Sequence, residues 1–359
     1  MSISSHLKLH AINLFGWRTK RKVVVFESDD WGMIRMASKK AYERLLKKGH
    51  PVDRSMYNKY DRIESNADVL GLMEVLDSVR DKNGNPARFT INNIVANPDF
   101  EKIAKAHYRT YFYEPFTSSL ERYSDTSQVM ELYHEGLDKK IFRPQFHGRE
   151  HLQINNWLKR LQNRDMPFID AFNENMYTIN PLEGNACFAE CLDGMSSYSK
   201  QDFAVITEAV KDGMDLFEGM WGFSSTSVIA PCYTWHSDLE TYFKSTGITY
   251  IQGARVQREP LATFEKKMRR HYMGQRSPLG LFYLIRNVHF EQVESTSKDW
   301  VDSAMGEIKT AFLHQKPAII STHRVNYIGT LDASNRSRNL KSLKTLLDRI
   351  VKTYPQGEF

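Results

Sequence analysis

The 359-residue sequence has little cysteine and no long apolar run. Its three cysteines, Cys187, Cys191 and Cys232, are odd in number and cannot form a disulfide framework, so we interpret them as buried thiols in a reducing compartment. No uninterrupted apolar stretch approaches the roughly 18 residues of a membrane-spanning helix, and the N-terminus lacks a signal-peptide core. These absences predict a cytoplasmic protein.

Signatures of nucleotide and nucleic-acid binding are also missing. No G-x-G-x-x-G follows an apolar run and no phosphate-loop motif occurs, so a dinucleotide or triphosphate site has no support. The net charge of +6 is partly local, in RTKRK (Arg18–Lys22) and EKKMRR (Glu265–Arg270). Neither run has the interleaved aromatic residues of a nucleic-acid reader. We interpret both as solvated faces, with an anionic surface or polymer as the alternative, and expect no nucleic-acid partner.

Residues 1–22 form a basic amphipathic segment. HLKLHAINLFGWRTKRK (His6–Lys22) mixes Leu, Ile, Phe and Trp with Lys and Arg, as a helix at a membrane surface does. Two interpretations stay open, a helix that packs on the protein and a peripheral membrane contact.

The rest of the chain alternates between strand-like and helical patterns. Strand-length apolar runs occur at Val23–Ser28, Arg88–Val95, Ile141–Phe146, Ser227–Pro231, Ile248–Gln252, Leu281–Ile285 and Ala318–Thr322. Helical periodicity occurs between them at Asn66–Lys82, Gln128–Lys140, Asp202–Gly222 and Asp299–Gln315. The alternation predicts an α/β fold, a distorted (β/α) barrel of seven or eight mostly parallel strands, with an open doubly wound sheet as the alternative. Residues 23–359 then form a single domain, in which 167–198 is an insertion with little regular structure.

Polar side chains gather where the predicted strands end. Catalytic groups of parallel α/β folds sit at the carboxyl ends of the strands. These positions hold Asp29 and Asp30, His147, the segment Pro231–Tyr233, and His323 with Arg324. Two carboxylates and several imidazoles are therefore expected at one end of the barrel.

His147 and His151 have the i, i+4 spacing that places two imidazoles on one face, provided a helix begins near Gly148. Two imidazoles and the Asp30 carboxylate can hold a divalent cation with open positions. Glu150 also makes this segment an HxxEH motif, in which the glutamate acts as the general base of a zinc peptidase. The peptidase remains an alternative.

Two further features have a purely structural alternative. His323 is either a functional group or a core histidine with a hydrogen-bond partner. Asp299 and Trp300, in SKDW, are either part of the site or a helix N-cap with a buried neighbour.

The ordered motifs together resemble the polysaccharide deacetylases of the NodB-homology type, carbohydrate esterase family 4. ESDDWG, HGREH, APCY, SKDW and STHR match the family's five motifs in order, over roughly Val23–Tyr327. The resemblance implies that Asp30, His147 and His151 bind a divalent metal, zinc in that family, which polarises the substrate and lowers the pKa of water. It implies that Asp29 is the general base.

The same resemblance assigns the remaining roles. The backbone N–H of Tyr233 would stabilise the oxyanion, and His323, oriented by Asp299, would protonate the leaving group. Trp300 would wall the acyl pocket. The remaining substrate-binding candidates are Trp31, Pro231 and Arg324.

The sequence departs from the family in its third motif. An arginine that pairs with the base is usual there, and this chain has Ala230 instead. The pairing then requires an arginine from elsewhere, for which Arg143, Arg149 and Arg324 are the candidates.

We therefore predict a metal-dependent hydrolase that removes an acyl group, acetyl in the simplest case, from a sugar. Without an export signal, the expected substrate is a glycan intermediate of cell-surface polysaccharide metabolism. The alternatives are a zinc metallopeptidase that uses Glu150 and a non-catalytic carbohydrate-binding barrel.

Overall fold

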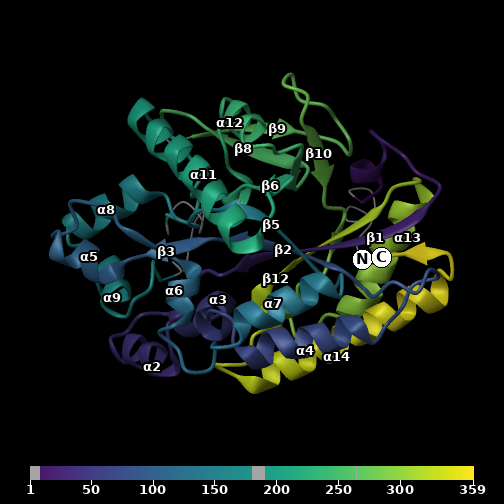
Figure 1. Ribbon diagram of the computed structural model, residues 1–359, viewed down its shortest axis with the longest axis horizontal. Coiled ribbons are helices and arrows are strands. Elements are labelled where there is room, and N and C mark those ends of the chain that lie inside the picture. Colours follow the sequence, from purple (N-terminus) through teal and green to yellow (C-terminus); the bar gives the residue numbers. More distant parts are fainter. Residues whose placement is uncertain (1–8, 180–190, 264) are drawn as a thin grey trace.

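The computed structural model describes residues 9–179, 191–263 and 265–359, and its centre is a parallel sheet surrounded by helices (Figure 1). In spatial order the strands are β10 (Phe282–Ile285), β7 (Tyr250–Gly253), β6 (Ser227–Ile229), β5 (Phe142–Gly148), β2 (Phe89–Ile94), β1 (Lys22–Trp31), β12 (Ala318–His323) and β11 (Val288–His289). All neighbouring pairs are parallel. The short β13 (Gly357–Glu358) pairs with the start of β1. Each of the seven predicted runs overlaps one of these strands.

The sheet closes on itself through one continuous segment. β10 and β11 stand at opposite ends of the strand order, yet only Arg286 and Asn287 separate them along the chain. The N–H of Arg286 donates to the carbonyl of Gly253 on β7 at 2.9 Å, and the N–H of Asn287 donates to that of Ile319 on β12 at 3.1 Å. The segment thus pairs with both edges, and the predicted distorted (β/α) barrel is confirmed.

Helices cover the outside of the barrel. The long ones are α4 (Asn66–Asp77), α7 (Val129–Asp138), α11 (Lys200–Trp221), α13 (Trp300–Leu313) and α14 (Ala333–Thr353). The shorter ones are α2 (Lys39–Lys47), α3 (Met56–Tyr60), α5 (Phe100–Lys105), α6 (Phe116–Leu120), α8 (Ile154–Gln162), α9 (Met166–Asn173) and α12 (Leu239–Ser245), with the 3₁₀ turns η1 (Val52–Arg54), η2 (Pro231–Tyr233), η3 (Gln292–Glu294) and η4 (Arg324–Tyr327). The four predicted helices are present and begin within two residues of their expected starts.

Local sequence sets the ends of these helices. The Ser199 side chain accepts a hydrogen bond from the N–H of Asp202 at the start of α11, and Gly222 ends that helix with a left-handed φ of 71°. Because a residue with a β-carbon is strained at this φ, glycine makes a sharp stop that turns the chain toward β6.

Two parts of the fold differ from the prediction. The insertion expected to have little regular structure contains helix α9, while residues 180–190 lie outside the described part. Two small antiparallel sheets also interrupt the strand–helix alternation: β3 (Ala96–Pro98) with β4 (Tyr113–Pro115), and β8 (Val256–Pro260) with β9 (Lys266–Arg270).

The cysteines also differ from expectation. Cys191 is buried and forms no disulfide, as predicted, but Cys232 forms one. Cys187 lies outside the described residues. Because disulfides persist in oxidising environments, the cysteine-based argument for a reducing compartment fails, and the cytoplasmic location remains only a prediction. Among the described helices, none is long and apolar enough to cross a membrane.

Strand β1 faces two environments. Val24 and Phe26 point outward, where the Phe26 ring stacks on Phe89 with centroids 5.0 Å apart. Since side chains alternate along a strand, Val25, Glu27 and Asp29 share the opposite, inward face. The barrel interior therefore changes from apolar to acidic toward the carboxyl end of β1.

Candidate active site at the carboxyl ends of the strands

A cavity of about 220 Å³ opens where the barrel strands end. Its described lining includes the predicted residues Asp29, Asp30, His147, His151, Tyr233 and His323, together with Tyr57 and Arg258, which were not predicted. The sequence prediction that strand ends bring these carboxylates and imidazoles together is confirmed.

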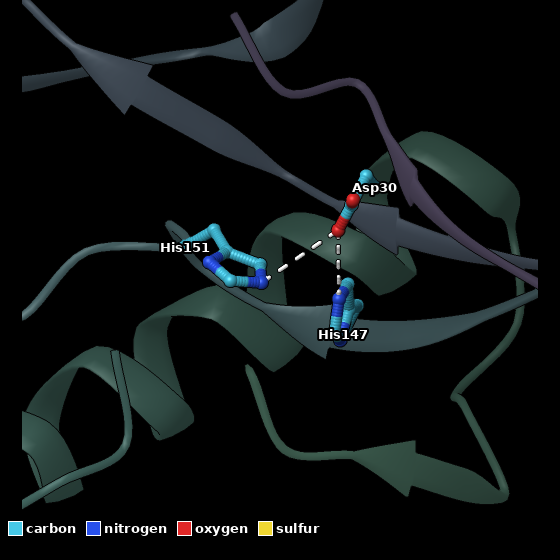
Figure 2. A group of neighbouring side chains, drawn as sticks. All are labelled: Asp30, His147 and His151. Atoms are coloured by element: carbon cyan, nitrogen blue, oxygen red, sulfur yellow. Dashed lines mark hydrogen bonds and ion pairs between the residues drawn. The ribbon is translucent and has the colours of Figure 1, made fainter. Parts of the chain in front are cut away.

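Asp30, His147 and His151 converge on one point (Figure 2). The Asp30 Oδ1 lies 3.3 Å from His147 Nε2 and 3.6 Å from His151 Nε2. Asp30 has a left-handed φ of 74°, which turns its carboxylate away from that of Asp29. The candidate ligand atoms all lie within 4.8 Å of one another, so the three residues can hold a metal ion.

The ring orientation of His147 suits a metal ligand. The Nδ1 of His147 lies 2.8 Å from the carbonyl oxygen of Ile229, and a carbonyl only accepts, so Nδ1 donates to it. This hydrogen bond fixes the ring with Nε2 facing the Asp30 carboxylate, the orientation in which Nε2 can bind an ion.

Burial lowers the pKa of His151 to about 4, with partial compensation from the Asp30 charge, so its imidazole is neutral near pH 7. Burial raises the pKa of Asp30, but the His147 hydrogen bond and the neighbouring imidazoles outweigh it and the net pKa is lowered. An ionised carboxylate and two imidazoles are a suitable ligand set for Zn²⁺ or a similar divalent ion.

No helix begins near Gly148, the condition under which the i, i+4 spacing would place both imidazoles on one helix face. β5 continues to Gly148, and the next helix, α8, begins only at Ile154, so His151 reaches the site from the loop between them. Glu150 is buried and binds the guanidinium of Arg149 through both oxygens, at 2.7 and 2.8 Å. Its carboxylate is therefore engaged, and Glu150 is absent from the described cavity lining.

Asp29 is held by an arginine that the sequence analysis missed. The Arg286 guanidinium binds both Asp29 oxygens at 2.6 Å, and Asn92 donates to Oδ1 at 2.7 Å. Burial raises the pKa of Asp29, but the charge and hydrogen bonds of Arg286 outweigh it, so the net pKa is lowered and the carboxylate is ionised at neutral pH. Arg286 also donates to Glu27 at 2.7 Å, which accounts for the third acid of the first strand.

Arg286 replaces all three arginines that were proposed as substitutes. Arg143 lies over the Phe223 ring at 3.9 Å, and Arg149 binds Glu150. Arg324 is fully buried and forms ion pairs with Asp61 and Glu64. The signal for Arg286 was present in the sequence, because it directly follows the predicted strand Leu281–Ile285.

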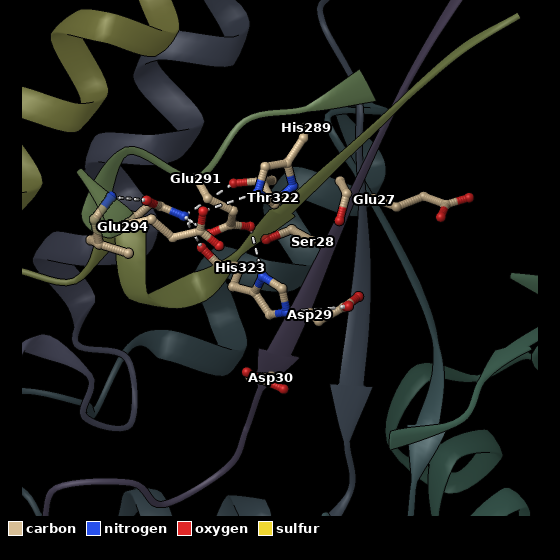
Figure 3. Close-up of polar contacts among 12 residues, drawn as sticks. Glu27, Ser28, Asp29, Asp30, His289, Glu291, Glu294, Thr322 and His323 are labelled. Carbon is tan, nitrogen blue, oxygen red and sulfur yellow. Dashed lines mark hydrogen bonds and ion pairs between the residues drawn. The ribbon is translucent and has the colours of Figure 1, made fainter. Parts of the chain in front are cut away.

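His323 lies between two carboxylates (Figure 3). Its Nδ1 is 2.6 Å from Glu291 Oε1, and its Nε2 is 3.7 Å from Asp29 Oδ2. The other Glu291 oxygen accepts from Asn326 at 2.7 Å, which fixes the carboxylate. Burial lowers the pKa of His323, but Glu291 and then Asp30 and Asp29 outweigh it and raise the pKa well above its usual range. The ring is thus an imidazolium at neutral pH.

The predicted contact between Asp299 and His323 is wrong. The Asp299 side chain instead accepts from the N–H of Asp302 at 2.8 Å as the N-cap of α13, which is the structural alternative. Trp300 donates its indole N–H to the Ser295 carbonyl and is absent from the described lining. Glu291 therefore takes the orienting position that was assigned to Asp299.

The backbone prediction for Tyr233 also fails. Its N–H donates to the carbonyl of Ala230 at 2.9 Å within η2, so it is engaged in a turn. The phenol does reach the site, where its oxygen accepts from Arg286 at 3.2 Å. Pro231 is not among the described lining residues, although Ala230 and Cys232 on either side of it are.

The two other substrate-binding candidates point elsewhere. Trp31 is fully buried, and its indole N–H donates to Ser28 Oγ at 2.9 Å in the layer between sheet and helices. The Arg324 guanidinium binds Asp61 at 3.0 Å and Glu64 at 2.8 Å. Neither residue is among the described residues of the cavity wall.

Comparisons with known proteins point to similar folds without assigning a family. No family model matches the chain, and no curated protein matches it. Among similar solved structures are a probable polysaccharide deacetylase from Pseudomonas aeruginosa PAO1 (7% identity, 95% of this chain and 88% of that chain, TM-score 0.48) and a polysaccharide deacetylase from Bacillus cereus (13% identity, 74% and 63%, TM-score 0.31). The allantoinase Puue is also similar (9% identity, 96% and 88%, TM-score 0.46). Such remote likenesses do not establish the activity of this chain, which has to be argued from its own residues.

Proposed function

We propose that the protein is a metal-dependent hydrolase that removes an acyl group, acetyl in the simplest case, from an amide or ester on a sugar or glycan intermediate. The observation that carries the proposal is that two adjacent carboxylates in one cavity have different partners. Asp30 faces two imidazole nitrogens at 3.3 and 3.6 Å, whereas Asp29 faces Arg286 and His323. One carboxylate is available to a cation and the other to proton transfer.

Asp30, His147 and His151 would hold the metal, for which we propose zinc. When bound, the ion acts as a Lewis acid on the acyl carbonyl and lowers the pKa of water. Asp29 then accepts the proton of the attacking water. Arg286 and Asn92 fix the orientation of that carboxylate, so it needs no reorganisation before the transfer.

His323 supplies the proton for the leaving group. Its hydrogen bond to Glu291 keeps the ring protonated and directs Nε2 into the cavity. An amine or alkoxide leaves much more readily when it is protonated as the bond breaks, and an imidazolium whose pKa is raised remains available for this at neutral pH.

Tyr233 contributes through its phenol rather than its backbone. The phenol oxygen already accepts from Arg286, so its own proton is free to point elsewhere, and no acceptor for it occurs among the described residues. We propose that this O–H donates to the acyl oxygen as negative charge develops there.

The two alternative functions receive less support. A peptidase would need Glu150 as a base in the cavity, and Glu150, unlike Asp29, is not among the described residues that line it. A non-catalytic carbohydrate-binding barrel would have no use for a converged Asp30, His147 and His151 set or for a protonated His323.

The N-terminal segment keeps its membrane-surface interpretation as a proposal. Leu14, Phe15 and Trp17 are 47%, 59% and 56% exposed, next to the basic residues of 18–22. Exposed apolar and basic side chains in one short segment are the pattern of an interfacial contact.

Metal content and deacylation of acetylated sugars, measured on the same preparations, test the proposed function. The wild type should bind about one equivalent of a divalent ion and release acetate. His147→Ala should lose both properties, whereas Asp29→Asn should keep the metal and lose activity by about 10²- to 10⁴-fold.

Glu150→Gln is the matched control for the peptidase, and it should deacylate at the wild-type rate if its fold is intact. A wild type that binds no metal after loading, or an Asp29→Asn variant that retains full activity, would overturn the proposal.

A further inference from the structure

Strands β8 and β9 pair with each other as a hairpin that is not part of the barrel sheet (Figure 1), and Arg258 of β8 lines the cavity. A bridge between Thr234 and Arg258 joins the hairpin to the segment that carries Tyr233. Its two strands are antiparallel, with Arg258 opposite Met268 and Val256 opposite Arg270. The hairpin therefore presents side chains directly to the rim of the site.

Alternation along β8 turns Arg258 toward the cavity. Gln257 donates to the Trp235 carbonyl at 3.0 Å, and Glu259 accepts from the N–H of Ser237 at 3.3 Å, so both point to the packed face of the hairpin. Arg258, between them, points to the other face. It is among the residues that line the cavity with Asp29 and Asp30.

The protein leaves this guanidinium without a counter-charge. Within the described part of the chain, the Arg258 side chain has no hydrogen-bond or ion-pair partner. The only acids in the described lining are Asp29 and Asp30. Arg286 neutralises the first, and the second faces the imidazoles and the proposed metal. An anion that pairs with Arg258 therefore has to arrive with the ligand.

The face of the hairpin that carries Arg258 is basic beyond this residue. Lys266 and Arg270 share that face by register. Lys266 pairs with Asp193 at 3.1 Å, whereas Arg270 is exposed and has no partner among the described residues. The positive face thus continues from the cavity to the surface.

We infer that Arg258 binds an anionic group of the substrate, a carboxylate or a phosphate, and that the protein acts on an acidic saccharide. This deepens the proposed function and depends on it. A guanidinium forms paired hydrogen bonds with either group, and it does so with better geometry than an ammonium. Because Arg258 and the proposed metal site share one cavity of about 220 Å³, the anionic group sits on the acylated sugar or its direct neighbour.

The test compares three matched substrates on metal-loaded protein. They are a neutral N-acetylglucosamine disaccharide, a disaccharide of N-acetylglucosamine and glucuronic acid, and N-acetylglucosamine 1-phosphate. The wild type should prefer at least one anionic substrate over the neutral one by about 10- to 100-fold in kcat/KM, the effect expected of a hydrogen bond to a charged group. The preferred anionic substrate identifies the group, a carboxylate or a phosphate.

Arg258→Gln should abolish this preference, mainly through KM, while it keeps the rate on the neutral substrate. Arg258→Lys should restore it in part. Lys267→Gln is the matched control, because it removes the same charge from the opposite face of the same hairpin, and its preference should equal that of the wild type. Equal preference in wild type and Arg258→Gln would overturn the inference.

A binding measurement separates this inference from the proposed reaction. Calorimetric titration of Asp29→Asn protein with glucuronic acid and with glucose 1-phosphate needs no turnover. Arg258→Gln should weaken this binding about 10-fold or more, and Lys267→Gln should leave it unchanged. This result would support the anion site even if no substrate is deacylated. If neither probe binds, or if both variants weaken it equally, the inference fails.

Discussion

The two ends of the barrel differ sharply in chemistry. The carboxyl end holds the cavity of about 220 Å³, with its carboxylates and imidazoles. The opposite end holds a larger cavity of about 500 Å³, the apolar chamber, lined among others by Trp17, Val23, Val25, Phe282, Leu284 and Ile319. One strand, β1, supplies inward side chains to both.

The boundary between these ends is an ion cluster. Going up β1, the inward residues are Val23, Val25, Glu27 and Asp29. Arg286 binds Glu27 at 2.7 Å and Asp29 at 2.6 Å, and so bridges the two acids across the interior. Buried carboxylates are costly without such compensation, so a single guanidinium lets the barrel change from apolar to acidic within two residues.

Removing the guanidinium should have the largest effect. Arg286→Met removes the guanidinium that binds both buried acids, Glu27 and Asp29, and we expect a loss of about 3–5 kcal/mol in the free energy of unfolding. The pKa of Asp29 should rise, because burial is then opposed only by the neighbouring imidazoles, and activity should fall with it. Urea unfolding and acetate release measure the two effects. Arg286→Lys should recover part of the stability, and an Arg286→Met protein as stable as wild type would contradict the cluster's role.

Metal removal should affect only the carboxyl end. With free metal about 1,000-fold above its Kd, the bound form should be more stable than the metal-free form by about 4 kcal/mol. Thermal unfolding with and without a chelator measures this gain. His151→Ala should lose this stabilisation by metal, whereas Val25→Leu, at the apolar end, should keep it. Equal stabilisation by metal in both variants would mean that the ion binds elsewhere.

The hydrogen bond between Glu291 and His323 should set the alkaline limit of activity. Because Glu291 raises the pKa of His323, Glu291→Gln should move the alkaline limb of the kcat/KM profile to lower pH. The pH at which the His323 contribution to the free energy of unfolding is lost should also move to lower pH in Glu291→Gln. The contribution of protonated His323 is complete below its unfolded pKa and is lost as pH rises through the higher folded pKa.

Glu294→Gln serves as the control for Glu291→Gln, since Glu294 pairs with His289 at 3.2 Å. Its pH profile should match that of the wild type. An alkaline limb that stays in place in Glu291→Gln would remove His323 from the role of acid.

Filling the apolar chamber should have the smallest effect. Val25→Leu adds one methylene to empty apolar space and should raise the free energy of unfolding by up to about 0.8 kcal/mol in urea titrations. Val24→Leu, the neighbour on the packed face, should cost about 1–3 kcal/mol because that face has no room. Equal effects at both positions would mean that the chamber is not open to a larger side chain.

The fold and the reacting side chains could be predicted from the sequence, because local patterns indicate both the strands and the residues at their carboxyl ends. Each predicted apolar run formed a strand, and the residues that end those runs, Asp29, Asp30, His147 and His323, met in one cavity. This works because alternation and the common carboxyl edge of a parallel sheet follow from chain geometry alone.

The partners of those side chains were decided only by the tertiary structure. Arg286 lies 257 positions from Asp29, and Glu291 lies 32 positions from His323, so no local pattern links either pair. Asp299 lost the predicted contact because its side chain caps α13, and Tyr233 lost its backbone role because its N–H closes a turn. The sequence by itself thus determined which groups stand at the carboxyl end of the barrel. Closure of the barrel through Arg286 and Asn287 decided which charge compensates which, because compensation depends on distances of a few ångströms between strands far apart in the chain.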